Sequence, residues 1–247
     1  MRLAVISDIH GNLEAFEQVL ADMETTRPEH VISLGDNIGY GPDSQAVMEI
    51  IMAQKIPSIL GNHEMVVKHP RFLNWFNPPA QKALGHALKT LSPKAVAHIK
   101  KMEACHVIPG KFRFVHGCPP ASPFLYLFQL KPSVLAKKIQ AMAEPVCISG
   151  HSHDLEYFQC IKGRVRERKI KERRLCLSPP CIFTAGSVGQ PRDGDPRAKY
   201  ALVDTDSLDV EIRQCPYDFK TTRAKMKAAG IPKTFRDRLG QSFKNEE

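Results

Sequence analysis

The sequence of 247 residues has no long apolar run and no cysteine framework. No stretch approaches the roughly 20 unbroken apolar residues that a membrane-spanning helix needs, so we expect no membrane partner. Residues 1–9 lack a basic region, a long apolar core and a small-residue cleavage site, so a secretory signal is not expected. The 7 cysteines are scattered without a CxxC pair. This pattern excludes a disulfide framework and a zinc ribbon and predicts a cytoplasmic protein with free thiols.

The net charge of +9 is concentrated in two segments. Residues 162–174 hold eight Lys or Arg and two Glu, and residues 217–247 hold eight Lys or Arg and four acids. The remainder of the chain is close to neutral in sum. Such segments are either a solvated charged surface or a means of steering an anionic substrate. Because no nucleic-acid-binding motif accompanies them, nucleic acid is not an expected partner.

The first part of the chain alternates short apolar runs with helical patterns. Residues 3–6, 31–34 and 57–60 are apolar runs typical of buried strands, and each is followed by polar residues and a predicted helix. This is a β-α-β-α-β pattern, and ligands bind at the carboxyl ends of the strands in such sheets. A helical insert is expected at 70–102 and a helical tail at 217–247. Between them the chain is rich in predicted strands, at 155–161, 164–176, 181–184, 199–204 and 208–213. Without a linker or repeat, residues 1–247 are predicted to form one domain.

Five predicted strand ends carry carboxylate, amide or imidazole groups. The motifs are D-I-H at 8–10, G-D at 35–36, G-N-H-E at 61–64, H-G at 116–117 and G-H-S-H at 150–153. Their repetition at one sheet edge argues against histidines that merely fill the core. Imidazole and carboxylate groups together suit borderline divalent ions. The ligands outnumber what one ion takes, so we expect two ions that share a bridging carboxylate, clamp a phosphoryl group and generate hydroxide.

The order of these motifs, from residue 8 to residue 153, resembles that of the calcineurin-like metallophosphoesterases. The resemblance implies an α/β fold, a four-layer αββα sandwich of two mixed β-sheets flanked by helices. It also implies a hydrolase, a phosphatase or phosphodiesterase, with a dinuclear metal centre. Seven side chains would hold the metals: Asp8, His10 and His153 on the first, Asn62, His116 and His151 on the second, and Asp36 bridging both.

The resemblance further implies that His63 contacts the phosphate and protonates the leaving oxygen without binding a metal. An imidazole is suited to this task because its pKa lies near the working pH. Asn12 and Glu64 are expected to orient the ligands. Manganese, iron, zinc, cobalt and nickel all accept this ligand set, so the metal identity stays open.

One departure from related subfamilies concerns the phosphate contact. Protein Ser/Thr phosphatases and symmetric dinucleoside tetraphosphatases follow their G-D with x-x-D-R-G, whereas this chain reads N-I-G-Y-G-P after Asp36. The missing arginine must be replaced by another group. Residues 186–195 resemble a segment of small prokaryotic members related to dinucleoside polyphosphate hydrolases and phosphodiesterases. Arg192 in this segment is either the replacement phosphate contact or an exposed turn residue.

We therefore predict a phosphoesterase acting on a small phosphorylated molecule, a nucleotide or dinucleoside polyphosphate. A serine/threonine phosphoprotein phosphatase is the alternative, and a non-catalytic scaffold of the same fold is disfavoured because all seven ligands are present. A helical cap from 70–102 or 119–142 would favour small substrates. Phe124, Tyr126 and Phe128 either stack on a base or pack within their loop.

Overall fold

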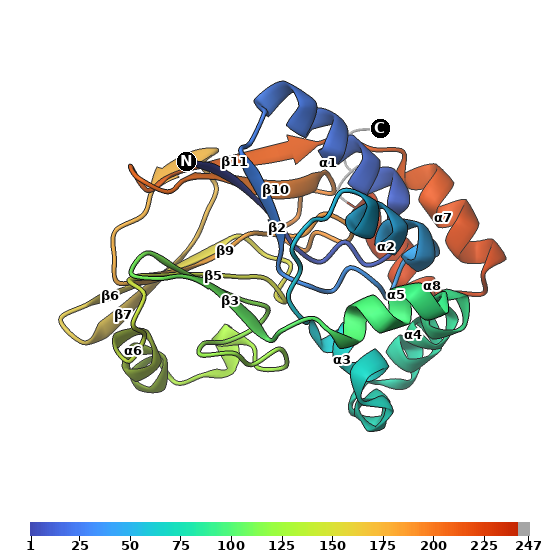
Figure 1. Ribbon diagram of the computed structural model, residues 1–247, viewed down its shortest axis with the longest axis horizontal. Helices are drawn as coiled ribbons and strands as arrows, with labels where there is room; N and C mark the ends of the chain where they lie inside the picture. Colours follow the sequence, from blue (N-terminus) through green and yellow to red (C-terminus); the bar gives the residue numbers. More distant parts are fainter. Residues whose placement is uncertain (242–247) are drawn as a thin grey trace.

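Two stacked β-sheets with helices on both outer faces form the protein (Figure 1). The computed structural model describes residues 1–241. The last six residues of the expected helical tail, 242–247, lie outside the described residues. No helix in the described part of the chain is long and apolar enough to cross a membrane.

The first sheet has the strand order β2-β1-β10-β11-β8. Its strands are β1 (Arg2–Ile6), β2 (His30–Ser33), β8 (Arg174–Cys176), β10 (Ala198–Asp204) and β11 (Asp209–Cys215). The second sheet has the order β3-β4-β5-β9-β6-β7. Its strands are β3 (Cys105–Ile108), β4 (Phe112–Val115), β5 (Val146–Ser149), β6 (Glu156–Ile161), β7 (Arg164–Lys169) and β9 (Cys181–Thr184). Both sheets are mixed. In the first sheet, β1 pairs in parallel with β2 and antiparallel with β10. In the second sheet, β9 pairs in parallel with β5 and antiparallel with β6.

The helices of the described chain separate into two groups. The larger group is α1 (Leu13–Thr26), α2 (Ser44–Ala53), α3 (Asn62–Lys68), α4 (Pro78–Thr90), α5 (Pro93–Lys100), α7 (Phe219–Ala228) and α8 (Lys233–Arg238), with the 3₁₀ turn η1 (Pro70–Trp75). A second 3₁₀ turn, η2 (Leu127–Gln129), precedes α6 (Pro132–Gln140). In Figure 1, α6 lies on the opposite side of the sheets from α1.

Alternation of side chains along the strands creates the layers. In β1, Ala4 and Ile6 belong to the core shared with α1, whereas Leu3 and Val5 belong to the core between the sheets. Successive side chains of a strand point to opposite faces, so one strand serves both cores. A third core joins Phe158 of β6 to α6. The αββα architecture predicted from the resemblance is thus confirmed.

Two predicted strands differ from the structure. The run 57–60 forms one parallel bridge, between Ser33 and Ser58, instead of a full strand. Pro57 lacks the N–H that would extend the ladder, and the N–H of Leu60 donates to Glu103 on another segment. The predicted strand 164–176 is divided between the sheets, with β7 in the second and β8 in the first. Ile170 is buried between the sheets at the crossover.

The two basic segments lie apart in the molecule. Residues 162–174 include the exposed edge strand β7, whereas residues 217–241 include α7 and α8. In Figure 1, β7 lies at the left of the molecule and α7 and α8 lie at the right. The two segments therefore do not merge into one basic patch.

Candidate metal centre

Five residues of the predicted site have left-handed backbone conformations at the strand ends. Their φ angles are 53° for Asp8, 50° for His10, 52° for Asp36, 69° for His151 and 61° for His153. Each non-glycine residue in this region costs about 1–2 kcal/mol. Strain of this kind persists where the surrounding structure holds it and concentrates at functional sites.

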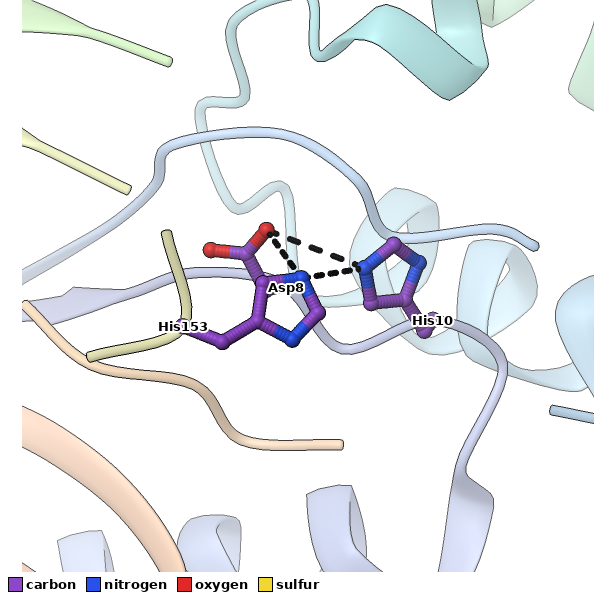
Figure 2. A group of neighbouring side chains, drawn as sticks. All are labelled: Asp8, His10 and His153. Atoms are coloured by element: carbon purple, nitrogen blue, oxygen red, sulfur yellow. Dashed lines mark hydrogen bonds and ion pairs between the residues drawn. The ribbon is translucent and has the colours of Figure 1, made fainter. Parts of the chain in front are cut away.

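The first cluster consists of Asp8, His10 and His153, all buried. Figure 2 shows these side chains pointing toward one another, Asp8 and His10 from the loop after β1 and His153 from the loop after β5. His10 Nε2 lies 3.0 Å from His153 Nε2, and Asp8 Oδ1 lies 3.2 Å from His153 Nε2. Asp8 Oδ1 has no hydrogen-bond partner among the described residues, while Oδ2 accepts from the hydroxyl of Ser7 at 2.6 Å. One carboxylate oxygen is thus held by the protein and the other faces the imidazoles.

The second cluster consists of Asp36, His116 and His151, with Asn62 beside it. His116 Nε2 lies 3.3 Å from Asp36 Oδ2, 3.2 Å from His151 Nδ1 and 3.1 Å from Asn62 Oδ1. Asp36 Oδ2 also lies 3.7 Å from His10 Nε2 of the first cluster. The Asp36 carboxylate therefore stands between the two clusters.

Four of the histidines are oriented by the backbone. Their outer ring nitrogens lie near carbonyl oxygens: His10 Nδ1 near Ile38 (3.2 Å), His116 Nδ1 near Leu34 (2.8 Å), His153 Nδ1 near Gln190 (2.6 Å) and His151 Nε2 near Phe124 (3.2 Å). A carbonyl only accepts, so each of these nitrogens donates its hydrogen. In a neutral ring the other nitrogen then presents a lone pair to its cluster.

His63 differs from these four histidines. Neither of its ring nitrogens has a hydrogen-bond partner among the described residues, although the side chain is fully buried. Its backbone N–H donates to Asp36 Oδ1 at 2.9 Å, and its Nε2 lies 3.8 Å from Asp36 Oδ2. Because no carbonyl sets its tautomer, either ring nitrogen can carry the proton.

The buried charges of the clusters perturb one another strongly. Burial alone would raise the pKa of Asp36, but His116 and His63 hold it well below its usual value. Burial alone would lower the pKa of His116, but Asp36 and Asp8 raise it to about 9. By contrast, burial lowers the pKa of His151 to about 3. In the metal-free centre, one imidazolium at His116 therefore faces two buried carboxylates.

The donor set fits two divalent metal ions. Within each cluster, the ligand atoms offered by its members lie within 4.8 Å of one another. Asp8 Oδ1 is buried without a hydrogen-bond partner, and a buried charge normally has either a partner or a metal. Ring nitrogens of imidazoles oriented by the backbone also converge on each cluster, and imidazole with carboxylate is the donor chemistry of borderline divalent ions.

Glu64 organises the loop that carries Asp36. Its carboxylate accepts from the backbone N–H groups of Asp36 and Asn37 at 2.8 Å each and of Gly61 at 3.0 Å. Burial, followed by the charge of Asp36, raises the pKa of Glu64 to about 7. Glu64 therefore contacts the backbone around the clusters and not the cluster atoms themselves.

Asn12 connects three segments beside the first cluster. Its Oδ1 accepts from the N–H of Ala15 at 3.2 Å, which caps α1, and from the hydroxyl of Thr222 at 3.1 Å. Its Nδ2 donates to the carbonyl of Gly189 at 2.8 Å. A Cβ at Gly189 would lie 1.8 Å from the carbonyl oxygen of Ile9, so this close approach requires glycine.

Arg192 lies at the edge of the first cluster. Its backbone N–H donates to the carbonyl of His153 at 3.1 Å. After burial, the charge of Arg192 is the next cause of the lowered pKa of His153. The guanidinium Nε is buried without a hydrogen-bond partner among the described residues.

Lys199 holds the loop that follows Arg192, since its ammonium donates to the carbonyls of Asp195 at 2.6 Å and Arg197 at 3.0 Å.

Aromatic rings cover the histidines. Ring centroids lie 4.4 Å apart for Tyr40 and His10, 5.1 Å for Phe76 and His63, and 3.7 Å for the stacked pair Tyr126 and His151. The loop-packing alternative thus describes Tyr126. The sequence offers a signal for Tyr40, because this residue follows the G-D motif within a G-Y-G sequence. Nothing in the local sequence marks Phe76 as a residue beside the histidines. On the far side of Tyr40, Phe235 of α8 stacks at 4.3 Å, so the C-terminal tail reaches the centre.

Comparison with known proteins agrees with this geometry. The model of the calcineurin-like phosphoesterase superfamily domain matches residues 1–208. A crystal structure of a metallophosphoesterase from Sphaerobacter thermophilus is 31% identical, with a TM-score of 0.84 over 98% of this chain and 99% of that one. An uncharacterized protein of Methanocaldococcus jannaschii is 28% identical over 96% of both chains. A hypothetical protein of Pyrococcus horikoshii, 17% identical with a TM-score of 0.77 over 96% of this chain and 97% of that one, shares the fold.

Proposed function

The chain belongs to the calcineurin-like phosphoesterase superfamily, and on this premise we propose that it hydrolyses a small phosphate ester at the clusters around Asp36. The family and the full-length likeness to a solved metallophosphoesterase make the protein a hydrolase of phosphate esters. We propose which residues of the protein carry out this hydrolysis, and we propose a nucleotide or dinucleoside polyphosphate as the substrate.

Seven side chains would hold two divalent metals. They are Asp8, His10 and His153 for the first, Asn62, His116 and His151 for the second, and Asp36 for both. When bound, two such ions supply an activated water and offset the charge of the phosphate. The donor set accepts manganese, iron, zinc, cobalt or nickel.

His63 is proposed as the general acid, and its unpartnered ring is the observation that carries the mechanism. The ring is buried beside Asp36 and free of hydrogen bonds to the described residues, so Nε2 can hold a proton and pass it to the leaving oxygen. Burial lowers the pKa of His63 to about 4. A bound phosphate brings negative charge next to the ring and raises that pKa toward the working range.

Arg192 is proposed as the phosphate contact that replaces the missing arginine. Its position beside His153 and its buried, unpartnered Nε support this role. A guanidinium binds phosphate oxygens through paired N–H groups. The rings of Tyr40, Phe76 and Tyr126 around the histidines favour a small substrate over a folded phosphoprotein.

A metal-by-substrate screen tests the proposal. The protein is stripped with a chelator, its metal content is measured by elemental analysis, and each of the five metals is added back. AMP, a dinucleoside tetraphosphate and a phosphoserine peptide serve as substrates. We expect hydrolysis after metal addition, with the nucleotides preferred. Full activity in verified metal-free protein would contradict the metal assignment, and preference for the peptide would favour the phosphoprotein phosphatase.

A further inference from the structure

Trp75 is the single tryptophan of the chain, and 67% of its surface is exposed. Its ring centroid lies 4.7 Å from that of Phe72 and 5.0 Å from that of Phe124, and the two phenylalanine rings lie 4.9 Å apart. We name these three residues the aromatic platform. It joins η1 to the loop before η2, segments that are remote in sequence.

Both sides of the aromatic platform are tied to the candidate metal centre. The carbonyl of Phe124 accepts the hydrogen bond from His151 Nε2 at 3.2 Å. Phe76, the neighbour of Trp75 in the chain, packs its ring against His63 at 5.1 Å. A planar group resting on the aromatic platform would therefore lie next to a phosphate held at the centre.

The surroundings of the aromatic platform carry positive charge. Residues 69–79 and 119–131, which supply its rings, contain no Asp or Glu. The guanidinium of Arg71 lies 5.2 Å from the centroid of the Phe72 ring and has no ion pair with any described carboxylate. An exposed aromatic surface flanked by a cation suits an anionic ligand with a flat ring better than it suits an aliphatic one.

We propose that the aromatic platform binds the base of a free nucleotide whose phosphate occupies the metal centre, an inference that rests on the proposed function. Every nucleobase has a π-face, so stacking provides affinity without strict base selection. Loss of a stacking ring should weaken nucleotide binding roughly tenfold. A phosphate ester that lacks a base gains nothing from the aromatic platform.

The single tryptophan makes binding directly observable. Stopped-flow fluorescence of the manganese-loaded protein is recorded before turnover, with AMP and with ribose 5-phosphate. We expect saturable quenching by AMP and none by ribose 5-phosphate. Equal responses to both ligands, or no response to either, would overturn the inference. Tighter quenching by a short (dA)₆ strand than by AMP would overturn the assignment to a free nucleotide.

Variants separate stacking from folding. Phe124→Leu keeps the reporter and should weaken the AMP-dependent quenching roughly tenfold. Trp75→Leu should raise KM for AMP by a similar factor and so narrow the difference in kcat/KM between AMP and ribose 5-phosphate. Phe128→Leu is the matched control, because Phe128 is also exposed, at 58%, but contacts Tyr126 and not Trp75. A loss of AMP affinity in Phe128→Leu equal to that in Phe124→Leu would contradict the inference.

Failure of this inference is distinguishable from failure of the proposed function. If ribose 5-phosphate and AMP are hydrolysed with equal kcat/KM and the fluorescence is silent, the phosphoesterase proposal stands and the aromatic platform has no role in binding. If neither ester is hydrolysed with any of the five metals, the substrate proposal itself fails.

Discussion

His63 contacts Asp36 in two unequal ways. Its backbone N–H donates to Asp36 Oδ1 at 2.9 Å, whereas its ring Nε2 stands 3.8 Å from Asp36 Oδ2 without a hydrogen bond. The backbone N–H of His63 thus positions the proposed bridging carboxylate of Asp36. The ring nitrogens of His63 form no hydrogen bond with the described residues and can therefore take part in proton transfer. Replacing the His63 side chain can therefore test its chemistry without removing the contact that holds Asp36.

His63→Asn should slow hydrolysis of nucleotide and alkyl esters by about 10²–10⁴. Hydrolysis of a p-nitrophenyl ester should slow much less, because p-nitrophenolate leaves readily without a proton. Metal content, measured by elemental analysis, should stay near two ions per chain. Equal slowing of both ester classes with the metals retained would point to phosphate binding instead of proton transfer.

Asp36→Asn should lose metal and activity together, because the change removes the charge between the two clusters. The measurement is metal content per chain alongside kcat. Asp206→Asn is the control, since this exposed carboxylate pairs with Lys111 away from the centre. If Asp36→Asn kept two ions per chain, the bridging role would be wrong.

Metal binding should strengthen as pH rises. In the metal-free protein, carboxylates raise the pKa of His116 to about 9, so below that pH its proton must leave before a metal binds. The apparent Kd should fall about tenfold per pH unit up to about pH 9 and then level off. Calorimetry in buffers of different ionisation enthalpy should detect about one proton released per bound ion at the second cluster. A flat dependence below pH 9 would contradict this account.

Lys199→Met should destabilise the protein by about 2–3 kcal/mol, since it leaves two carbonyls and Asp193 without their buried ammonium partner. The measurement is urea unfolding, with the exposed Lys111→Met as control. Loosening the loop that follows Arg192 should also raise KM more than it lowers kcat. A change in stability alone would show that Arg192 does not depend on Lys199.

Neutralising charges of the basic segment 162–174, which includes the edge strand β7, should weaken substrate capture and leave the chemical step unchanged. Four basic residues of this segment form no ion pair with a described carboxylate, unlike Arg168, Lys169 and Arg174. The variant changes these four residues to Gln and so removes four charges: Arg164, Arg166, Lys171 and Arg173. We expect kcat/KM to fall at low salt, the fall to shrink as salt is added, and kcat to stay unchanged. An equal fall in kcat would place these residues at the reacting groups.

The local pattern of the chain predicts the strand ends well and the strand partners less well. Asp8, Asp36, His116 and His151 follow apolar runs, and the structure brings their side chains together. They do not share the edge of one sheet, because β1 and β2 belong to the first sheet and β4 and β5 to the second. The pattern of 164–176 does not reveal the crossover at Ile170, because β-propensity is the same in either sheet. Sheet membership depends on which distant strand offers a free edge.

The sequence by itself determined the strand ends and the composition of the candidate donor set, because apolar runs and the motifs that follow them are local. The order of those motifs also carried the resemblance to the family, and the resemblance implied the αββα fold. Only the tertiary structure decided how the imidazoles are aimed, since each outer nitrogen donates to a carbonyl of another segment. It also decided that Phe235 stacks on Tyr40 and that Trp75 meets Phe124. Contacts between residues so far apart in the chain leave no local period, so packing alone selects them.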